Sequence, residues 1–312
     1  RSTGNMTMLA DSLFNAAGVS YSQLDFDGAW DFVQEGLEIS RSIGSVHLEV
    51  IALADSVQYH MNSGEIGRAL GATEEGLEKL NEIVGSDFIT AYLHAIAATV
   101  YGLIGMGDAA IEKALLATNL IDPRRRWSFN TPLALGYTLI GRLPEAEETL
   151  QTLYQQPRFE SKRHLDYFGI VTPMADLVRG EFLLAKKEYH QILDYDLSAH
   201  GLTGDMPASL ILPDLLRIRG QALVALDRTG EAREILVRAL EMAEARGTRL
   251  TIWRILLELS EVARLENRHE DSEQLLRQSR EVIDYLAGRC GREEVRDGFL
   301  DHPAVRKALG GE

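Results

Sequence analysis

A repeated phrase is the sequence feature that most constrains the fold. It consists of a glycine, a short spacer, a small residue and an apolar run. The clearest copies are Gly64 to Ala69, Gly141 to Ala146, Gly180 to Ala185 and Gly230 to Ala232, and weaker ones surround Ala29, Ala110 and Ser272. The small residues recur about every 40 residues, the length of one helix pair. Such a chain folds as a stack of similar units.

Small residues at matched positions predict where two helices cross closely. Twelve residues before the marker stands another residue that is small in most units, such as Ala17, Ala98 and Gly220. Helices approach closely only where the side chains between them are small. Apolar residues follow the 3.6-residue helical spacing, as at Leu236 and Ala239, and strand-like alternation is absent. These observations predict an all-α chain.

Glycines are expected to mark the turns between helices, because they adopt left-handed backbone conformations without strain. We expect such turns at Gly64, Gly105, Gly141 and Gly180. The pattern resembles the tetratricopeptide repeat over roughly residues 8–289. The usual unit has 34 residues, so the longer period is similar to the long-helix variety of bacterial signalling ATPases, cyclases and maltose-type regulators.

We therefore predict one domain over residues 1–312, an all-α right-handed superhelical solenoid of about seven antiparallel helix pairs with a C-terminal capping helix. Each unit is expected to touch chiefly its neighbours. The predicted repeats are 8–44, 46–85, 87–122, 124–157, 161–198, 207–247 and 248–289, followed by the cap at 291–309.

The cap has its own signals. Phe299 is expected to pack on the last repeat, Asp301 to cap the final helix and Pro303 to occupy its first turn. The phrase from Val295 to Leu309 also resembles the closing segment of large bacterial multi-domain regulators. That resemblance implies that the chain is the C-terminal part of a longer protein, although a generic end cap explains the same residues.

Charge and composition exclude several classes of function. The net charge of −15 disfavours autonomous binding to nucleic acid or anionic lipid. The single cysteine, Cys290, cannot form an intramolecular disulfide, and neither a secretory leader nor a membrane-spanning run is evident. A cytoplasmic location without membrane contact is therefore expected.

Motifs that carry chemistry are absent from the sequence. It contains no phosphate-binding glycine loop, no His-Glu-x-x-His pair and no Gly-x-Ser-x-Gly elbow. Acidic pairs such as Glu147 and Glu148 are typical of solvated helix faces. We therefore expect no catalytic residue, no metal and no cofactor.

The inner surface of the superhelix is the expected binding surface, and the first helix of each pair should line it. Its middle is mildly apolar and its C-terminal part carries charges of both signs, a gradient that a peptide could recognise. The candidate residues are Tyr92, Thr131, Tyr167, Met174, Arg217 and Arg254. Alternatively, Tyr167 and Met174 belong to the packed core.

A basic rim is the second candidate. Between residues 123 and 164 seven basic residues face four acidic ones, in an otherwise acidic chain. The rim consists of Arg124, Arg125, Arg126, Lys162 and Arg163. It could hold an acidic peptide, a C-terminal carboxylate or a phosphate, whereas solvated charge or ion pairs with the acidic remainder are the simpler explanation.

Three functions compete. The favoured one is a non-catalytic protein–protein interaction region of a larger cytoplasmic signalling or transcriptional regulator, whose partner is a peptide, another protein or a domain of the same chain. The alternative is a small-ligand sensor that encloses an effector, with Tyr92, Trp127 and Tyr167 as aromatic candidates. An enzyme on a helical scaffold is the third, and no constellation supports it.

Overall fold

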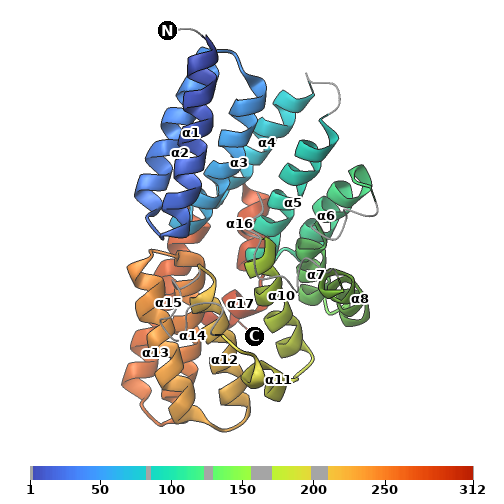
Figure 1. Cartoon of the computed structure of the whole chain (residues 1–312). Coiled ribbons are helices and arrows are strands. Elements are labelled where there is room, and N and C mark those ends of the chain that lie inside the picture. The colour runs from blue at the N-terminus through green and yellow to red at the C-terminus, as the bar shows by residue number, and fades with distance from the viewer. Residues whose placement is uncertain (1–2, 82–85, 123–128, 156–170, 198–209, 312) are drawn as a thin grey trace.

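The computed structural model describes residues 3–81, 86–122, 129–155, 171–197 and 210–311, which form sixteen helices and no strand (Figure 1). The prediction of an all-α helical repeat is confirmed. Seven successive pairs are followed by two short helices. The pairs are α1 (Thr3–Ser22) with α2 (Phe26–Ser42), α3 (Val46–Ser63) with α4 (Ile66–Leu80), α5 (Asp87–Leu103) with α6 (Gly107–Leu120), α7 (Asn130–Leu139) with α8 (Leu143–Tyr154), α10 (Val171–Ala185) with α11 (Tyr189–Asp194), α12 (Leu212–Ala225) with α13 (Thr229–Ala245), and α14 (Arg249–Leu265) with α15 (His269–Ala287); the short helices are α16 (Glu293–Leu300) and α17 (Pro303–Leu309).

Each pair is joined by a tight turn with one residue in the left-handed backbone region. Glycine fills this position in three pairs, at Gly64, Gly105 and Gly141. The other four turns use residues with side chains, which pay a conformational cost there. They are Leu24, Lys187, Asp227 and Asn267.

The expected turn at Gly180 is wrong. Gly180 lies inside α10, and the turn of this pair is centred on Lys187, at φ 61°. A Cβ atom at Gly180 would lie 2.9 Å from the side chain of Ile218, so this glycine allows close packing of α10 on α12. Ala185, expected in the second helix, ends the first one and is exposed.

The small residues of the other units lie where the two helices of a pair meet. Ala69, Ala110, Ala146 and Ala232 are fully buried. Close approach is equally evident at Gly220, where an added Cβ would lie 2.6 Å from the side chain of Leu236. A larger side chain at these positions would clash with the facing helix.

The first helices form the inner layer of the superhelix, and this layer closes on itself. Helices α3, α5, α7, α10, α12 and α14 each contact the next, and α14 in turn contacts α3. Each repeat has its largest contacts with its neighbours, and the last one in addition contacts the second. The superhelix completes a turn within seven pairs and brings the C-terminal helices against the second and third pairs (Figure 1).

Polar and apolar contacts join the last repeat and the cap to the second and third pairs, and we call this contact region the seam. Arg289 pairs with Glu65 at 2.8 Å, and Arg292 pairs with Glu74 at 2.7 Å and donates to the Tyr101 hydroxyl at 3.0 Å. Arg249 donates to the carbonyl of Ser63 at 3.1 Å. One hydrophobic cluster spans the seam, since it combines buried residues between 53 and 110 with buried residues between 250 and 308.

The cap consists of two short helices rather than one. Phe299 is fully buried against Trp253 of the last repeat, with ring centroids 6.2 Å apart, as expected. Pro303 occupies the first turn of α17, also as expected. The N-cap residue of α17 differs from the expected Asp301, because His302 Nδ1 accepts the hydrogen bond from the Ala304 amide.

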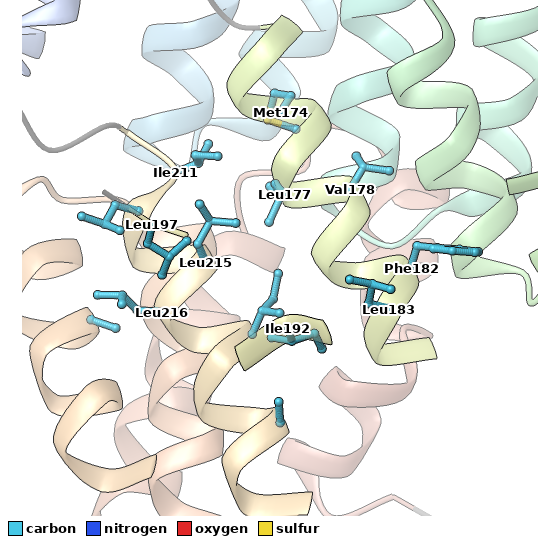
Figure 2. Close-up of a cluster of buried hydrophobic side chains, with 14 of the residues drawn as sticks. Met174, Leu177, Val178, Phe182, Leu183, Ile192, Leu197, Ile211, Leu215 and Leu216 are labelled. Atoms are coloured by element: carbon cyan, nitrogen blue, oxygen red, sulfur yellow. The ribbon is translucent and has the colours of Figure 1, made fainter. Parts of the chain in front are cut away.

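A second large cluster fills the space between α8, α10, α12 and α13. Figure 2 shows Leu177 of α10 pointing towards Leu215 of α12, whereas Val178 and Phe182 point to the other side of α10. The cluster fixes α10 against α12 and thereby places the polar residues that follow on both helices.

Within the described residues, no helix combines the length and apolar character needed to cross a bilayer.

Candidate functional site

A cavity of about 140 Å³ lies inside the ring of first helices. Five first helices contribute to its wall, namely α5, α7, α10, α12 and α14, and the turn into α17 contributes His302 and Ala304. The cavity thus depends on ring closure, because its walls come from residues between 102 and 304.

One wall of the cavity is apolar. It is made by leucine side chains from α5, α7, α10 and α14. These residues are Leu103, Leu135, Leu139, Leu177 and Leu257. A cavity with one apolar and one polar wall matches ligands that have an apolar body and a few polar groups.

A chain of hydrogen bonds forms the polar wall and links three helices. Arg217 of α12 donates to Glu181 of α10, and it also donates to the Gln221 side-chain oxygen at 3.2 Å. The amide nitrogen of Gln221 donates in turn to Glu258 of α14. Gln221 therefore relays between a guanidinium and a carboxylate, and the chain holds the three helices in register.

Two further residues complete the polar wall. Asp214 accepts a hydrogen bond from the Thr251 hydroxyl at 2.8 Å, and its other oxygen lies 3.9 Å from Nε of Arg217. Arg254 of α14 donates to the backbone carbonyl of Leu103, at the end of α5. This last bond crosses the seam between the last repeat and the third.

Burial makes these charges costly. Burial raises the pKa values of Asp214 and Glu258, in each case against the opposing effect of Arg217. Burial lowers the pKa of Arg254. It also lowers the pKa of His302, from 6.5 to about 4. His302 is consequently neutral at pH 7. A group that stabilised these buried charges would therefore be favoured in the cavity.

The structure brings two of the sequence-predicted site residues together. Arg217 and Arg254 both line the cavity. Met174 and Thr131 are buried instead, Met174 in the cluster of Figure 2, and Thr131 Oγ1 has no hydrogen-bond partner within the part of the chain described. Tyr92 is half-buried between two small apolar clusters.

The remaining predicted residues lie outside the described residues. They are Tyr167, Trp127 and the whole basic rim, Arg124, Arg125, Arg126, Lys162 and Arg163.

Two titratable residues of the cavity, Glu181 and His302, are not indicated by the sequence pattern. Glu181 was missed because the turn was placed at Gly180, which ended the first helix too early. With Ile192 as the marker of the fifth unit, Gly180 falls twelve residues before it, where the other units have their small residue. His302 was missed because nothing in its local sequence indicates that the cap reaches the inner surface.

The inner surface continues towards the N-terminus on α3. Asn62 donates to the hydroxyl of Tyr21 on α1 at 2.8 Å, and Asp55 lies two turns earlier on the same face. Burial raises the pKa of Asp55 to about 7.

Among the described residues no group of three His, Cys, Asp or Glu side chains is arranged to hold a metal ion.

Comparisons with known proteins show the fold. No family model and no curated protein matches this sequence. A solved structure described as a Rap protein complexed with competence and sporulation factor matches with a TM-score of 0.64 and 12% identity, over 96% of this chain and 88% of that one. The chain is thus a tetratricopeptide-like helical repeat solenoid. At this identity the likeness concerns the fold alone.

Proposed function

We propose that this chain is a non-catalytic interaction domain that binds a protein or peptide partner on the inner face of its superhelix. The fold match carries this proposal, because it spans nearly the whole chain and the similar protein is complexed with a factor. The polar groups on the inner faces of α3, α12 and α14 support it, since a peptide needs hydrogen-bond partners as well as apolar contacts.

We further propose that residues 1–312 act as one domain, and that it serves a larger cytoplasmic signalling or transcriptional regulator. The seam supports the first point, because it ties the last repeat to the second and third. The second point rests on the resemblance of the repeats and the cap to long-helix bacterial regulators. The partner is then either a separate protein or another domain of the same polypeptide.

Selection of peptides from a displayed random library tests partner binding. Asp55→Asn and Tyr92→Ala change the inner face, and Glu78→Gln on the exposed side of α4 is the matched control. The expected result is that selected peptides lose affinity for the inner-face variants by about tenfold, the effect of one charged hydrogen bond, and keep it for the control. Equal binding by all variants would rule out the inner face.

The basic rim needs a separate test, since it implies an acidic partner. Combined Arg126→Glu and Arg163→Glu substitutions should weaken capture of an acidic peptide and reduce the salt dependence of binding, because rim charges steer association. Unchanged affinity at every salt concentration would remove the rim from the binding surface.

A small-ligand sensor is the second candidate function, and the cavity inside the ring of helices favours it. Its walls come from both sides of the seam, so a ligand inside would stabilise the closed ring. A thermal-shift screen against a metabolite panel tests this function. The sensor function requires at least one compound that raises the melting temperature in proportion to its concentration.

A further inference from the structure

Two opposite charges on α14 face the cavity without pairing. Arg254 and Glu258 are four residues apart, so their Cβ atoms lie about 5–6 Å from each other on one helix face. Oppositely charged residues at this spacing commonly form an ion pair. Within the described part of the chain, neither of them lies within 4.0 Å of an opposite charge. Arg254 turns to the Leu103 carbonyl and Glu258 to the Gln221 amide.

The other charges of the cavity have charged partners within the protein. Arg217, which is 4% exposed, pairs with Glu181 and has Asp214 beside it. Asp214 also accepts the hydroxyl hydrogen bond of Thr251. One guanidinium and one carboxylate therefore remain in the wall whose hydrogen-bond partners are neutral, and opposite charges act on them only from beyond ion-pair distance.

An unpaired buried charge is costly, and both groups carry this cost. Burial lowers the pKa of Arg254 and raises that of Glu258, so each loses part of its preference for the charged form. A ligand that brings one anionic and one cationic group would offset both costs at once. A simple cation would leave Arg254 without a counter-charge, and a simple anion would leave Glu258 without one.

The apolar wall and the size of the cavity define the rest of the ligand. The leucine side chains of α5, α7, α10 and α14 line the same cavity as the two charges and offer an apolar surface there. The cavity volume is about 140 Å³. An apolar cavity of about 150 Å³ holds a molecule as large as benzene, so a short aliphatic chain with a charged head fits here.

We propose that the cavity binds a free α-amino acid with an aliphatic side chain. Its carboxylate pairs with Arg254, its ammonium group pairs with Glu258, and its side chain packs against Leu103, Leu135 and Leu177. A guanidinium binds a carboxylate through two parallel hydrogen bonds. Residues inside a peptide chain lack both charges, so the ligand is the free amino acid. This inference rests on the small-ligand sensor function and does not depend on peptide binding.

A matched set of three compounds tests the inference on the unmodified chain. L-norvaline carries both charges, n-butylammonium lacks the carboxylate, and pentanoate lacks the ammonium group. Isothermal titration calorimetry should find L-norvaline bound at least tenfold more tightly than either analogue, because each lost charged hydrogen bond weakens binding about ten- to a hundredfold. Binding of either analogue within about threefold of L-norvaline, or no binding of L-norvaline, would overturn the proposal.

Variants then assign each charge to its residue. In Glu258→Gln the preference for L-norvaline over pentanoate should disappear, and in Arg254→Met the preference over n-butylammonium should disappear. Glu261→Gln, on the same helix but paired with Arg264 and Lys307 instead, is the control and should bind as the parent does. Retention of both preferences in both cavity variants would overturn the assignment.

The outcomes also distinguish a failure of this inference from a failure of the sensor function on which it rests. If another metabolite raises the melting temperature and L-norvaline does not, the sensor function stands and the amino-acid site is wrong. If no compound does so, both are wrong. Peptide selection reports on the proposed interaction domain in either case.

Discussion

Gly67 and Gly291 meet backbone to backbone where the ring of helices closes. A Cβ atom on Gly67 would lie 2.7 Å from the Cα atom of Gly291, and the Gly67 amide donates to the Arg289 carbonyl at 2.8 Å. Gly291 has a φ of 74°, a conformation that favours glycine. The first turn of α4 thus docks on the segment between α15 and α16 through contacts that leave no room for a side chain.

Gly67→Ala should therefore destabilise the closed ring. Since the facing atoms are backbone, relief requires movement of α4 or of the cap, at a cost of about 1–3 kcal/mol. A lower melting temperature in thermal unfolding is the expected result. Gly71→Ala is the control on the same helix, because nothing lies within 4 Å of its added Cβ. Gly71→Ala should stabilise the fold by about 0.5–1 kcal/mol. An equal loss of stability in both variants would contradict the close contact between Gly67 and Gly291.

Arg217→Met should destabilise the cavity wall strongly. Removal of one partner from a buried ion pair costs about 3–5 kcal/mol, and the lower end applies here because Glu181 is 29% exposed. Chemical denaturation measures the loss. Addition of Glu181→Gln to Arg217→Met should recover part of the stability, because the uncompensated carboxylate is then gone. Additive losses in the double variant would mean that the two side chains do not interact.

Asp55 should make stability fall as pH rises. Its pKa is raised to about 7 in the folded chain, against an ordinary value of 3.8, so the folded state binds more protons between these values. Stability is then lost progressively from pH 4 to pH 7. Asp55→Asn should be more stable than the parent at pH 8 and equal to it near pH 4. Parallel melting curves at both pH values would contradict the raised pKa.

His302 should make stability fall as the pH falls, the opposite of the effect of Asp55. Burial lowers its pKa from 6.5 to about 4, so the unfolded chain binds more protons in this range and stability falls on acidification through it. His302→Asn keeps a side-chain acceptor for the Ala304 amide. The variant should lose less stability than the parent between pH 6.5 and pH 4, as followed by denaturant midpoints. A pH dependence identical to that of the parent would exclude His302 as the cause.

Ala146→Phe should overpack the fourth pair. Ala146 is fully buried at the start of α8, and insertion of a large side chain into such a site costs about 1–3 kcal/mol or more. Glu148→Phe places the same side chain two residues further along, at an exposed position. Circular dichroism during thermal unfolding should show a large loss for the first variant and little change for the second.

The helical repeat could be predicted from local sequence because its causes are local. Apolar spacing, small residues at helix crossings and turn glycines such as Gly64 and Gly141 act within one or two helices. The same reasoning failed at Gly180, because a glycine serves a turn and a close helix contact equally well. The turn that exists there uses Lys187, which carries no glycine-like signal.

The candidate site was only half predictable. Arg217 and Arg254 follow from the helical register, and both line the cavity. Glu181 required the correct end of α10, and His302 required the position of the cap.

The sequence by itself determined the helix pairs, their approximate period and the inward direction of residues such as Arg217. Only the tertiary structure decided that the superhelix closes, because closure is the sum of small rotations between neighbouring pairs, and no single segment encodes it. The contact between Gly67 and Gly291 and the unpaired charges of Arg254 and Glu258 exist only in the closed ring. Residues far apart in the chain come into contact there, so the interactions between them cannot be derived from the sequence alone.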